Sequence, residues 1–212
     1  MKFSKINERN RKQWFYDKKD DYILLRKHMF FFAKEICNYI KDKNLKILEV
    51  GPAINGYKEK YDEFSTKIIQ DTCLENKIYY KTLDIIPDFG CNYTGTIEDL
   101  SFINEKFDIV ILLGIIEHVQ KIHLVPDELK KITTENGILF INTPYMFKIH
   151  GPTPDCWRIS PFGFSTLFEG WNLSFNTYPV EELGKNTFPL SINTIASKTT
   201  NAETIISGYK AI

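Results

Sequence analysis

The fold is decided by residues 45–56, Leu-Lys-Ile-Leu-Glu-Val-Gly-Pro-Ala-Ile-Asn-Gly, where an apolar run ends in an acidic residue and a glycine-bounded turn. This pattern predicts a buried strand that leads into a ligand-binding loop. Because glycine has no Cβ, the backbone at Gly51 and Gly56 can pass close to a bound small molecule, and the free N–H groups of the next helix can meet its polar atoms. The expected ligand is a cofactor that carries a nucleoside.

Length and composition predict a single domain over residues 1–212, because 43% hydrophobic residues suit one well-packed core. No run of eighteen apolar residues is present, so neither a membrane span nor a secretion signal is expected. The cysteines are far apart in sequence, which favours reduced thiols in a cytoplasmic protein over disulfides or a zinc site. They are Cys37, Cys73, Cys91 and Cys156.

Charge is balanced overall, which argues against a nucleic-acid partner. Its distribution is uneven, since residues 1–46 hold 13 of the 27 basic and 6 of the 27 acidic residues. Two interpretations stay open: a solvated helical face, or an N-terminal helical lid (residues 1–44) that attracts an anionic substrate such as a phosphorylated or nucleotide-linked sugar. Trp14 and Tyr16 are candidates to line that lid, and ordinary packing is the alternative for both.

Hydrophobic periodicity predicts an α/β core over residues 45–198. Apolar residues at three- and four-residue steps indicate an amphipathic helix from Tyr22 to Ile40, and a polar helix should follow Gly56. Buried parallel strands are expected at 79–84, 107–113 and 137–142, a helix around 119–134, late strands near 171–175 and 190–198, and a tail at 199–212. Such an alternation places ligands at the carboxyl ends of the strands.

Acidic residues at two strand ends suggest how the cofactor is held. Asp84 closes the second strand, where a carboxylate can accept both ribose hydroxyls, although an aspartate there can also cap a turn. A dinucleotide-binding unit would place its acid about 20 residues past the glycines and would not normally carry Glu49 before them. A nicotinamide-dependent oxidoreductase is therefore the weaker alternative. Asp71 has the shorter spacing, but the residues before it make a poor strand.

From about Leu45 to Trp171, the sequence resembles the class I S-adenosylmethionine-dependent methyltransferases. The segments that carry the resemblance are, in order, 49–53, 83–85, 95–100, 107–110, Ile116-Glu117-His118-Val119 and 135–139. The resemblance implies a Rossmann-like, seven-stranded, mostly parallel sheet flanked by helices. It also implies S-adenosylmethionine as cofactor and S-adenosylhomocysteine as product.

Matching positions imply a cofactor site. Glu49 would order the loop and the methionine amino end, Asp84 would hold the ribose, and Leu113 would face the cofactor with its carbonyl. The full set is Glu49, Gly51, Ala53, Gly56, Asp84, Ile85, Thr96, Ile97, Glu98 and Leu113, with Ile85 and Ile97 on the two faces of adenine. Ala53 replaces the family's usual second glycine and Thr96 its usual adenine-loop acid, so a non-catalytic scaffold stays an alternative.

Histidines near strand ends are the candidates for catalysis. A hydroxyl acceptor must lose its proton as the new bond forms, and an imidazole suits that task near neutral pH. His150, after the fifth strand, is the candidate base. His118 is the second candidate, with a structural or cofactor role favoured. No metal is expected, because the strand ends after Leu113 and Asn142 gather no carboxylates.

Residues 150–161 resemble the His-x-x-Pro-x-Asp-Tyr-Trp-Arg-Phe-Thr-Pro signature of a methyltransferase subgroup linked to surface-glycan or small-molecule modification, with Cys156 in place of Tyr. In the substrate site Asp155 would orient His150, Arg158 would clamp an anion, and Trp157 or Tyr145 would stack on a sugar; alternatively, Trp157 and Arg158 anchor the loop. The predicted function is O-methylation of a small molecule or of a sugar or surface-polysaccharide precursor. N-methylation is the alternative, and a homo-oligomer stays open.

Overall fold

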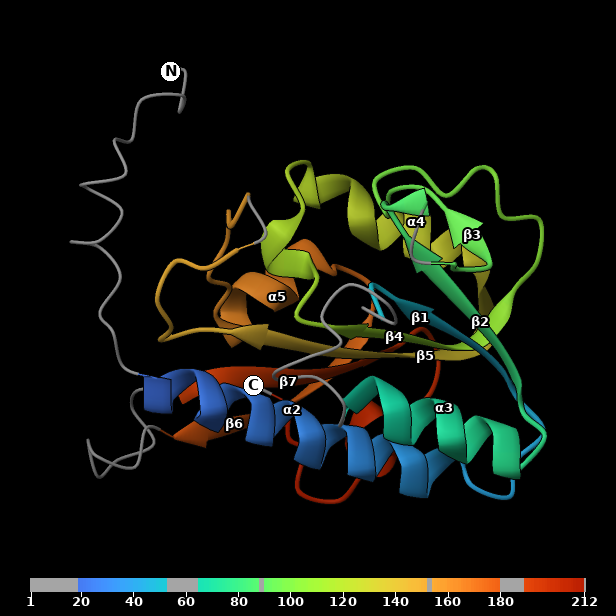
Figure 1. Cartoon of the computed structure of the whole chain (residues 1–212), viewed down its shortest axis with the longest axis horizontal. Helices are drawn as coiled ribbons and strands as arrows, with labels where there is room; N and C mark the ends of the chain where they lie inside the picture. The colour runs from blue at the N-terminus through green and yellow to red at the C-terminus, as the bar shows by residue number, and fades with distance from the viewer. Residues whose placement is uncertain (1–18, 53–64, 88–89, 152–153, 180–188, 212) are drawn as a thin grey trace.

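A seven-stranded sheet forms the centre of the molecule (Figure 1), in the strand order β3-β2-β1-β4-β5-β7-β6. The computed structural model describes residues 19–52, 65–87, 90–151, 154–179 and 189–211. The strands are β1 (Lys46–Val50), β2 (Tyr79–Asp84), β3 (Tyr93–Thr94), β4 (Phe107–Leu113), β5 (Thr133–Pro144), β6 (Asn172–Pro179) and β7 (Pro189–Ser197). Only the pairings of β7 are antiparallel among the described strands. The predicted mostly parallel sheet is confirmed.

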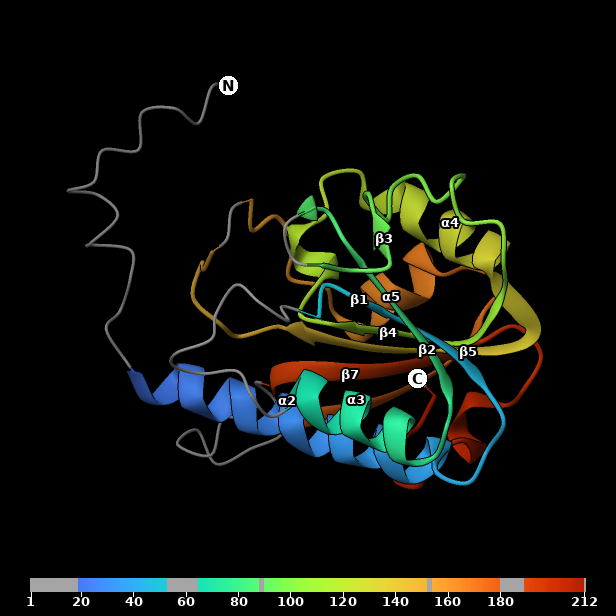
Figure 2. The same ribbon diagram turned by 45° about the vertical axis from the view of Figure 1, so that its right-hand side comes forward.

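Helices cover both faces of this sheet, as Figures 1 and 2 show. On one face lie α2 (Lys19–Ile40) and α3 (Ser65–Glu75); on the other lie α4 (Val125–Ile132) and α5 (Pro161–Leu167). Short 3-10 turns complete the described helices: η2 (Ile116–His118), η3 (Ile122–Leu124) and η5 (Ala202–Thr204). The predicted helix before the first strand is α2, and the predicted helix after the first loop is α3.

Burial on both faces explains the nearly continuous apolar runs of the central strands. One cluster packs the sheet against α4 and α5 and includes Leu48 and Val110; the other packs it against α2 and α3 and includes Phe32, Ile47 and Ile69. All five side chains are fully buried. Because β1 pairs in parallel with both β2 and β4, the carboxyl ends of these strands meet at one edge of the sheet.

Several predicted boundaries differ from the observed ones. The helix expected around 119–134 is shorter, because η3 precedes α4 and the chain enters β5 at Thr133, earlier than predicted. The Thr133 hydroxyl bonds the carbonyl of Leu129 and so closes the end of the helix. β3 was not predicted, since a two-residue strand carries no periodicity. The late strands are confirmed as β6 and β7, with shifted ends.

Residues 199–211, expected to form a tail, pack against the core through two buried side chains. Ala202 and Tyr209 are buried, and the backbone of Lys210 bonds that of Phe175 in β6. The Tyr209 hydroxyl accepts from Asn193 Nδ2 at 3.3 Å and donates to a carboxylate oxygen of Glu35 in α2 at 2.9 Å. The C-terminal segment therefore joins β7 to α2.

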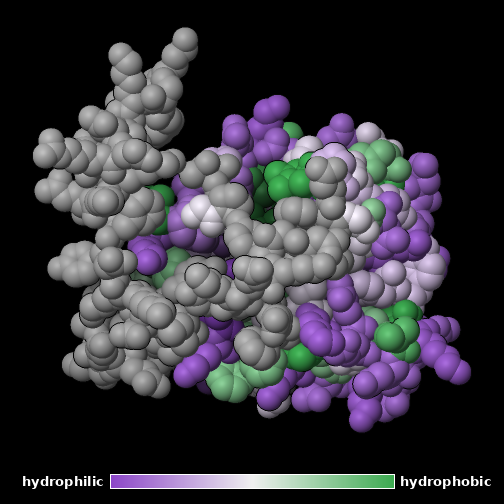
Figure 3. Space-filling model, viewed as in Figure 1, coloured by the Kyte–Doolittle hydropathy of each residue, from purple (hydrophilic) through white to green (hydrophobic). Residues whose placement is uncertain are grey.

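No helix within the described ranges is long and apolar enough to cross a membrane. Although α2 has 22 residues, Arg26, Lys27, Lys34 and Glu35 interrupt its apolar residues along the sequence. In the view of Figure 3 the described surface is largely hydrophilic, with small apolar patches. All four cysteines are free thiols, as predicted.

Candidate active site

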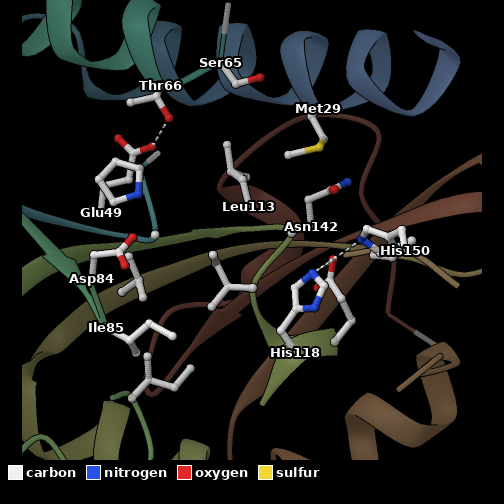
Figure 4. A pocket seen from close by; sticks show the side chains of 18 of the residues that line it. Met29, Glu49, Ser65, Thr66, Asp84, Ile85, Leu113, His118, Asn142 and His150 are labelled. Carbon is white, nitrogen blue, oxygen red and sulfur yellow. Dashed lines mark hydrogen bonds and ion pairs between the residues drawn. The ribbon is translucent and has the colours of Figure 1, made fainter. Parts of the chain in front are cut away.

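A pocket opens at the carboxyl ends of β1, β2, β4 and β5 (Figure 4). Glu49 and Asp84 lie toward one end of it, whereas His118 and His150 lie together at the other. Met29, on α2, also lines the pocket. Parallel strands gather their carboxyl ends in this way, so the pocket lies at the edge of the sheet where the sequence predicts a ligand.

Glu49 is nearly fully buried near the end of β1 and links that strand to α3. Its carboxylate accepts hydrogen bonds from the hydroxyls of Thr66 at 2.8 Å and Tyr80 at 2.5 Å. Burial raises the pKa of Glu49 to about 7, and the two hydrogen bonds oppose that rise. The carboxyl group thus fixes the start of α3 beside the pocket.

Asp84 ends β2, and its side chain is 8% exposed. Its Oδ1 accepts from the backbone N–H of Ile86 at 2.9 Å, which turns the chain across the pocket. Burial raises the pKa of this carboxyl above its usual value. Asp71, the alternative ribose ligand, instead lies within α3 and pairs with Lys67 at 2.7 Å on the surface. Only Asp84 of these two lines the pocket.

Gly51 passes closest to the pocket floor. Its φ of +66° lies in the left-handed region, and a Cβ there would meet Ile115 Cδ1 at 2.2 Å. The Gly51 N–H donates to the carbonyl of Leu83 at 2.8 Å, which holds the turn against β2. The backbone conformation therefore favours glycine, and a Cβ at this position would also require the end of the Ile115 side chain to move. Ala53 and Gly56, predicted with it, lie outside the described residues.

The predicted adenine side is only partly in the pocket. Ile85, Thr96 and Ile97 line it, and Leu113 closes its floor at the end of β4. Glu98 does not line it among the described residues. One of its carboxylate oxygens accepts instead from the backbone N–H groups of Gln120 and Lys121, both at 2.9 Å, and so caps the turn after η2.

The other end of the pocket holds Glu117, His118 and His150. Glu117 Oε1 lies 3.9 Å from His118 Nε2 and 3.8 Å from His150 Nε2, and the ring centroids are 4.9 Å apart. Burial raises the pKa of Glu117 to about 8. Burial also lowers the pKa of His150 to about 4, although the charge of Asp155 opposes this. At neutral pH, His150 is therefore neutral.

The segment after β5 is held by its own side chains. Arg158 binds Asp155 with two hydrogen bonds, of 2.5 and 2.7 Å, and also donates to the carbonyls of Phe147 and Lys148. Trp157 Nε1 donates to the carbonyl of Val119 at 2.6 Å. These contacts favour the anchoring alternative for Trp157 and Arg158.

Four residues predicted for the substrate site contribute no described lining atoms to the pocket: Tyr145, Asp155, Trp157 and Arg158. Trp14 and Tyr16 lie outside the described residues. Sequence reasoning missed Glu117, Asn142 and Met29 as site residues. Glu117 stands beside His118 in a segment already singled out, so its acidic side chain was the available signal. Met29 belongs to the periodic apolar face of α2, which was assigned to packing alone.

Comparison with known proteins agrees with this geometry. Residues 76–141 match the family model of a methyltransferase domain. A search of curated proteins gives no match. Among solved structures, a SAM-dependent methyltransferase from Archaeoglobus fulgidus superposes with a TM-score of 0.59 at 15% identity, over 81% of this chain and 93% of that one.

Two further structures show the range of chemistry on this fold. A SAM-dependent methyltransferase from Thermotoga maritima, described as a possible histamine N-methyltransferase, gives a TM-score of 0.53 at 14% identity, over 90% of this chain and 96% of that one. The CurJ carbon methyltransferase gives 0.55 at 15% identity, over 75% and 50%. Identities this low show a shared fold and leave the acceptor open.

The domain match over residues 76–141 and the shared fold together support a class I S-adenosylmethionine-dependent methyltransferase. The same findings support S-adenosylmethionine as the cofactor. The end of the pocket that holds Glu49 and Asp84, called the cofactor end below, fits this molecule. A buried strand-end carboxylate, a glycine in the left-handed region and the start of α3 surround one space there. Of the described residues predicted to contact the cofactor, only Glu98 is directed elsewhere.

Proposed function

We propose that the protein transfers the methyl group of S-adenosylmethionine to an oxygen atom of a small molecule or of a sugar or surface-polysaccharide precursor. The observation that carries this is the pairing of two unlike ends in one pocket. Carboxylates suited to the cofactor lie at one end, and two imidazoles lie at the other. An acceptor between them would have the methyl donor on one side and proton-accepting nitrogen on the other.

The reaction is an in-line displacement. A lone pair of the acceptor oxygen forms the new C–O bond while the C–S bond breaks, its electrons return to sulfur, and S-adenosylhomocysteine leaves. The acceptor's O–H bond must also break, and we assign its proton to His150 Nε2. The neutral imidazole has the lone pair of Nε2 available for the proton. The hydroxyl becomes much more acidic as the C–O bond forms, so even a weak base suffices.

Asp155 positions this base. Its Oδ2 lies 3.0 Å from His150 Nδ1 and also accepts from the backbone N–H of His150 at 2.8 Å. A carboxylate on the Nδ1 side favours the proton there and leaves Nε2 free, although the ring contact has ion-pair distance without hydrogen-bond geometry. Arg158 in turn fixes both oxygens of Asp155. We therefore assign Asp155 and Arg158 to the support of His150.

Two other functions remain as alternatives. The first is N-methylation of a small molecule, which a neutral His150 would also suit. The Thermotoga maritima structure above is described as a possible histamine N-methyltransferase. A non-catalytic scaffold was suggested by Ala53 and Thr96; Thr96, which stands in place of the usual acid, lines the pocket. The acceptor experiment separates the first alternative, and cofactor binding separates the second.

The test is formation of S-adenosylhomocysteine with matched acceptor pairs, each offering the same scaffold with a hydroxyl or an amine. We expect turnover with hydroxyl acceptors, and at least a tenfold loss in kcat for His150→Ala with an unchanged affinity for S-adenosylmethionine. His123→Ala is the matched control, because His123 is exposed and outside the described pocket lining. Turnover of the amine members alone would replace O-methylation by N-methylation, and full activity of His150→Ala would remove the base.

A further inference from the structure

Three side chains at the far end of the pocket form a group with the composition of a metal site. Glu117 and His118 come from η2, which follows β4, and His150 comes from the segment after β5. One ligand atom from each, a carboxylate oxygen or a ring nitrogen, lies within 4.8 Å of the other two. Two imidazoles and one carboxylate are donors that bind first-row transition metals.

In each of the two imidazole rings, Nδ1 already faces an oxygen atom of the protein. His118 Nδ1 donates to the carbonyl of Pro154 at 2.7 Å, and His150 Nδ1 lies 3.0 Å from Asp155 Oδ2. Histidines that bind metals usually place the second ring nitrogen against a carbonyl or carboxylate, which fixes the ring and directs the other lone pair at the ion. In both rings the nitrogen left over is Nε2, the atom that faces Glu117.

Glu117 supplies a second observation. Its side chain is 2% exposed, and its Oε2 has no hydrogen-bond partner among the described residues. A buried carboxyl oxygen without a partner is costly, and a bound cation would remove that cost. The backbone of Glu117 is fixed as well, because its carbonyl accepts from the N–H groups of Cys156 and Trp157.

We propose that Glu117, His118 and His150 bind one divalent transition-metal ion, of the Mn²⁺ to Zn²⁺ series, through one carboxylate oxygen and the two Nε2 atoms. Three protein ligands leave at least one coordination position for a water molecule or an acceptor oxygen from the pocket. Two nitrogen donors disfavour Mg²⁺ and Ca²⁺, which prefer oxygen. This site differs from the sequence-based expectation of no metal, which rested only on the lack of carboxylates at the strand ends.

The distances are compatible with this assignment. Tetrahedral ligands at about 2.1 Å from an ion lie about 3.4 Å from each other. The separations of 3.8 and 3.9 Å from Glu117 Oε1 must therefore close by about half an ångström. Side-chain rotation can supply that movement, because the side chains of His118 and His150 keep 21% and 15% exposure.

The consequence for catalysis rests on the proposed O-methylation. An acceptor hydroxyl bound to the ion loses its proton to water more readily, and the resulting oxygen anion attacks the methyl carbon while the C–S bond breaks. His150 Nε2 is the proton acceptor in the metal-free protein; when the ion is bound, the same atom is a ligand and water takes the proton. Metal binding and methyl transfer can still be measured separately, since binding needs neither cofactor nor acceptor.

The experiment is a titration of the tag-free, metal-stripped protein with Co²⁺ by visible absorption and with Zn²⁺ by calorimetry, with Mg²⁺ for comparison. We expect one equivalent per chain, a Co²⁺ spectrum of four- or five-coordination, and at least a hundredfold weaker Zn²⁺ binding in His118→Ala, His150→Ala and Glu117→Gln. His123→Ala should bind as the unaltered protein does.

Wild-type binding that is no tighter than that of His118→Ala and His150→Ala would overturn the metal site. So would one-equivalent binding that both histidine variants retain. The wild-type Co²⁺ spectrum keeps the test decisive even if Glu117→Gln fails to fold. Binding of S-adenosylmethionine and turnover with hydroxyl acceptors, measured on the same samples, show separately whether the proposed function fails.

Discussion

The two ends of the pocket are built in different ways. At the cofactor end, Glu49 and Asp84 are placed by the parallel sheet, because β1 pairs with residues 79–83 of β2 and Asp84 pairs with Thr94 of β3. At the opposite end, Glu117, His118 and His150 come from a 3-10 turn and an irregular segment. These are joined by side-chain bonds such as Trp157 to Val119 and His118 to Pro154. One end is fixed by backbone pairing and the other by individual contacts, so single substitutions should affect them separately.

The largest effect on stability is expected from a substitution at Arg158, which anchors the irregular segment after β5. Arg158→Met leaves the Asp155 carboxylate, 1% exposed, without its cation, and we expect a loss of about 3 kcal/mol in the free energy of unfolding. Urea unfolding measures it, and Arg158→Lys, which keeps the charge, should lose less. Affinity for S-adenosylmethionine should change less than threefold in the folded variant. A large loss of that affinity would show that the two ends are not separate.

At the cofactor end, Asp84→Ala should weaken S-adenosylmethionine binding about a hundredfold. Two charge-assisted hydrogen bonds to the ribose, of about 1.5 kcal/mol each, would be lost. Calorimetry measures the affinity, and Asp71→Asn is the control because Asp71 lies on the surface of α3. Equal losses in both variants would return Asp71 to consideration, and no binding by the unaltered protein would favour a scaffold.

In the metal-stripped protein, stability should fall as pH rises from 6.5 to 8. Glu117 has a folded-state pKa of about 8 against an ordinary value of 4.5, so the folded protein holds a proton that the unfolded chain releases. That stability is complete below pH 4.5 and is lost up to about pH 8, at about 1.4 kcal/mol per pH unit.

The pH range of 6.5 to 8 is chosen because two histidines act in the opposite direction below it. His28 and His150 have pKa values lowered to about 4, so their contribution to stability increases as pH rises from 4 to 6.5. Above pH 6.5 their contribution is constant. Urea unfolding at several pH values should therefore give a negative slope for the unaltered protein and a shallower one for Glu117→Gln. Glu49, with a pKa of about 7, supplies the slope that remains. Identical slopes for the two proteins would contradict the buried, protonated Glu117.

The smallest effect compares two glycines in the left-handed region. Gly51→Ala and Gly170→Ala should each cost roughly 1 kcal/mol of stability from backbone strain. A Cβ at Gly51 also meets Ile115, whereas one at Gly170 has nothing within 4 Å. Only Gly51→Ala should therefore weaken S-adenosylmethionine binding as well. Thermal unfolding and calorimetry measure the two quantities, and equal cofactor affinities would show that Ile115 yields without cost.

The cofactor end could be predicted from sequence because its signals are local. The run before Gly51 and the acid that closes residues 79–84 each lie within one strand, and a parallel sheet brings such ends together. The strands at 79–84 and 107–113 were predicted with their observed bounds for the same reason. Glu98 was the exception, because its carboxylate serves a backbone turn that the sequence does not reveal.

The opposite end could not be predicted to the same depth. His118 and His150 were singled out as separate candidates, but their contact depends on how the segment after β5 folds back over η2. That path is fixed by Arg158 and Trp157, whose partners are mostly backbone carbonyls and therefore leave no trace in the residue pattern. The packing of Tyr209 escaped prediction because its partners lie far away in sequence.

Tyr209 also gives a direction to a chain of hydrogen bonds that ends in the pocket. Glu35 accepts from the Tyr209 hydroxyl, which accepts from Asn193, whose side-chain carbonyl accepts from Asn142 Nδ2 at 2.5 Å. Every donor in this relay points away from the pocket, so the amide of Asn142 cannot turn round without breaking it. Its Oδ1, which has no partner among the described residues, is the atom left for a ligand. While Glu35 is ionised, this relay leaves Asn142 Oδ1 as an acceptor in the pocket lining, suited to a ligand that brings an N–H or O–H to that point.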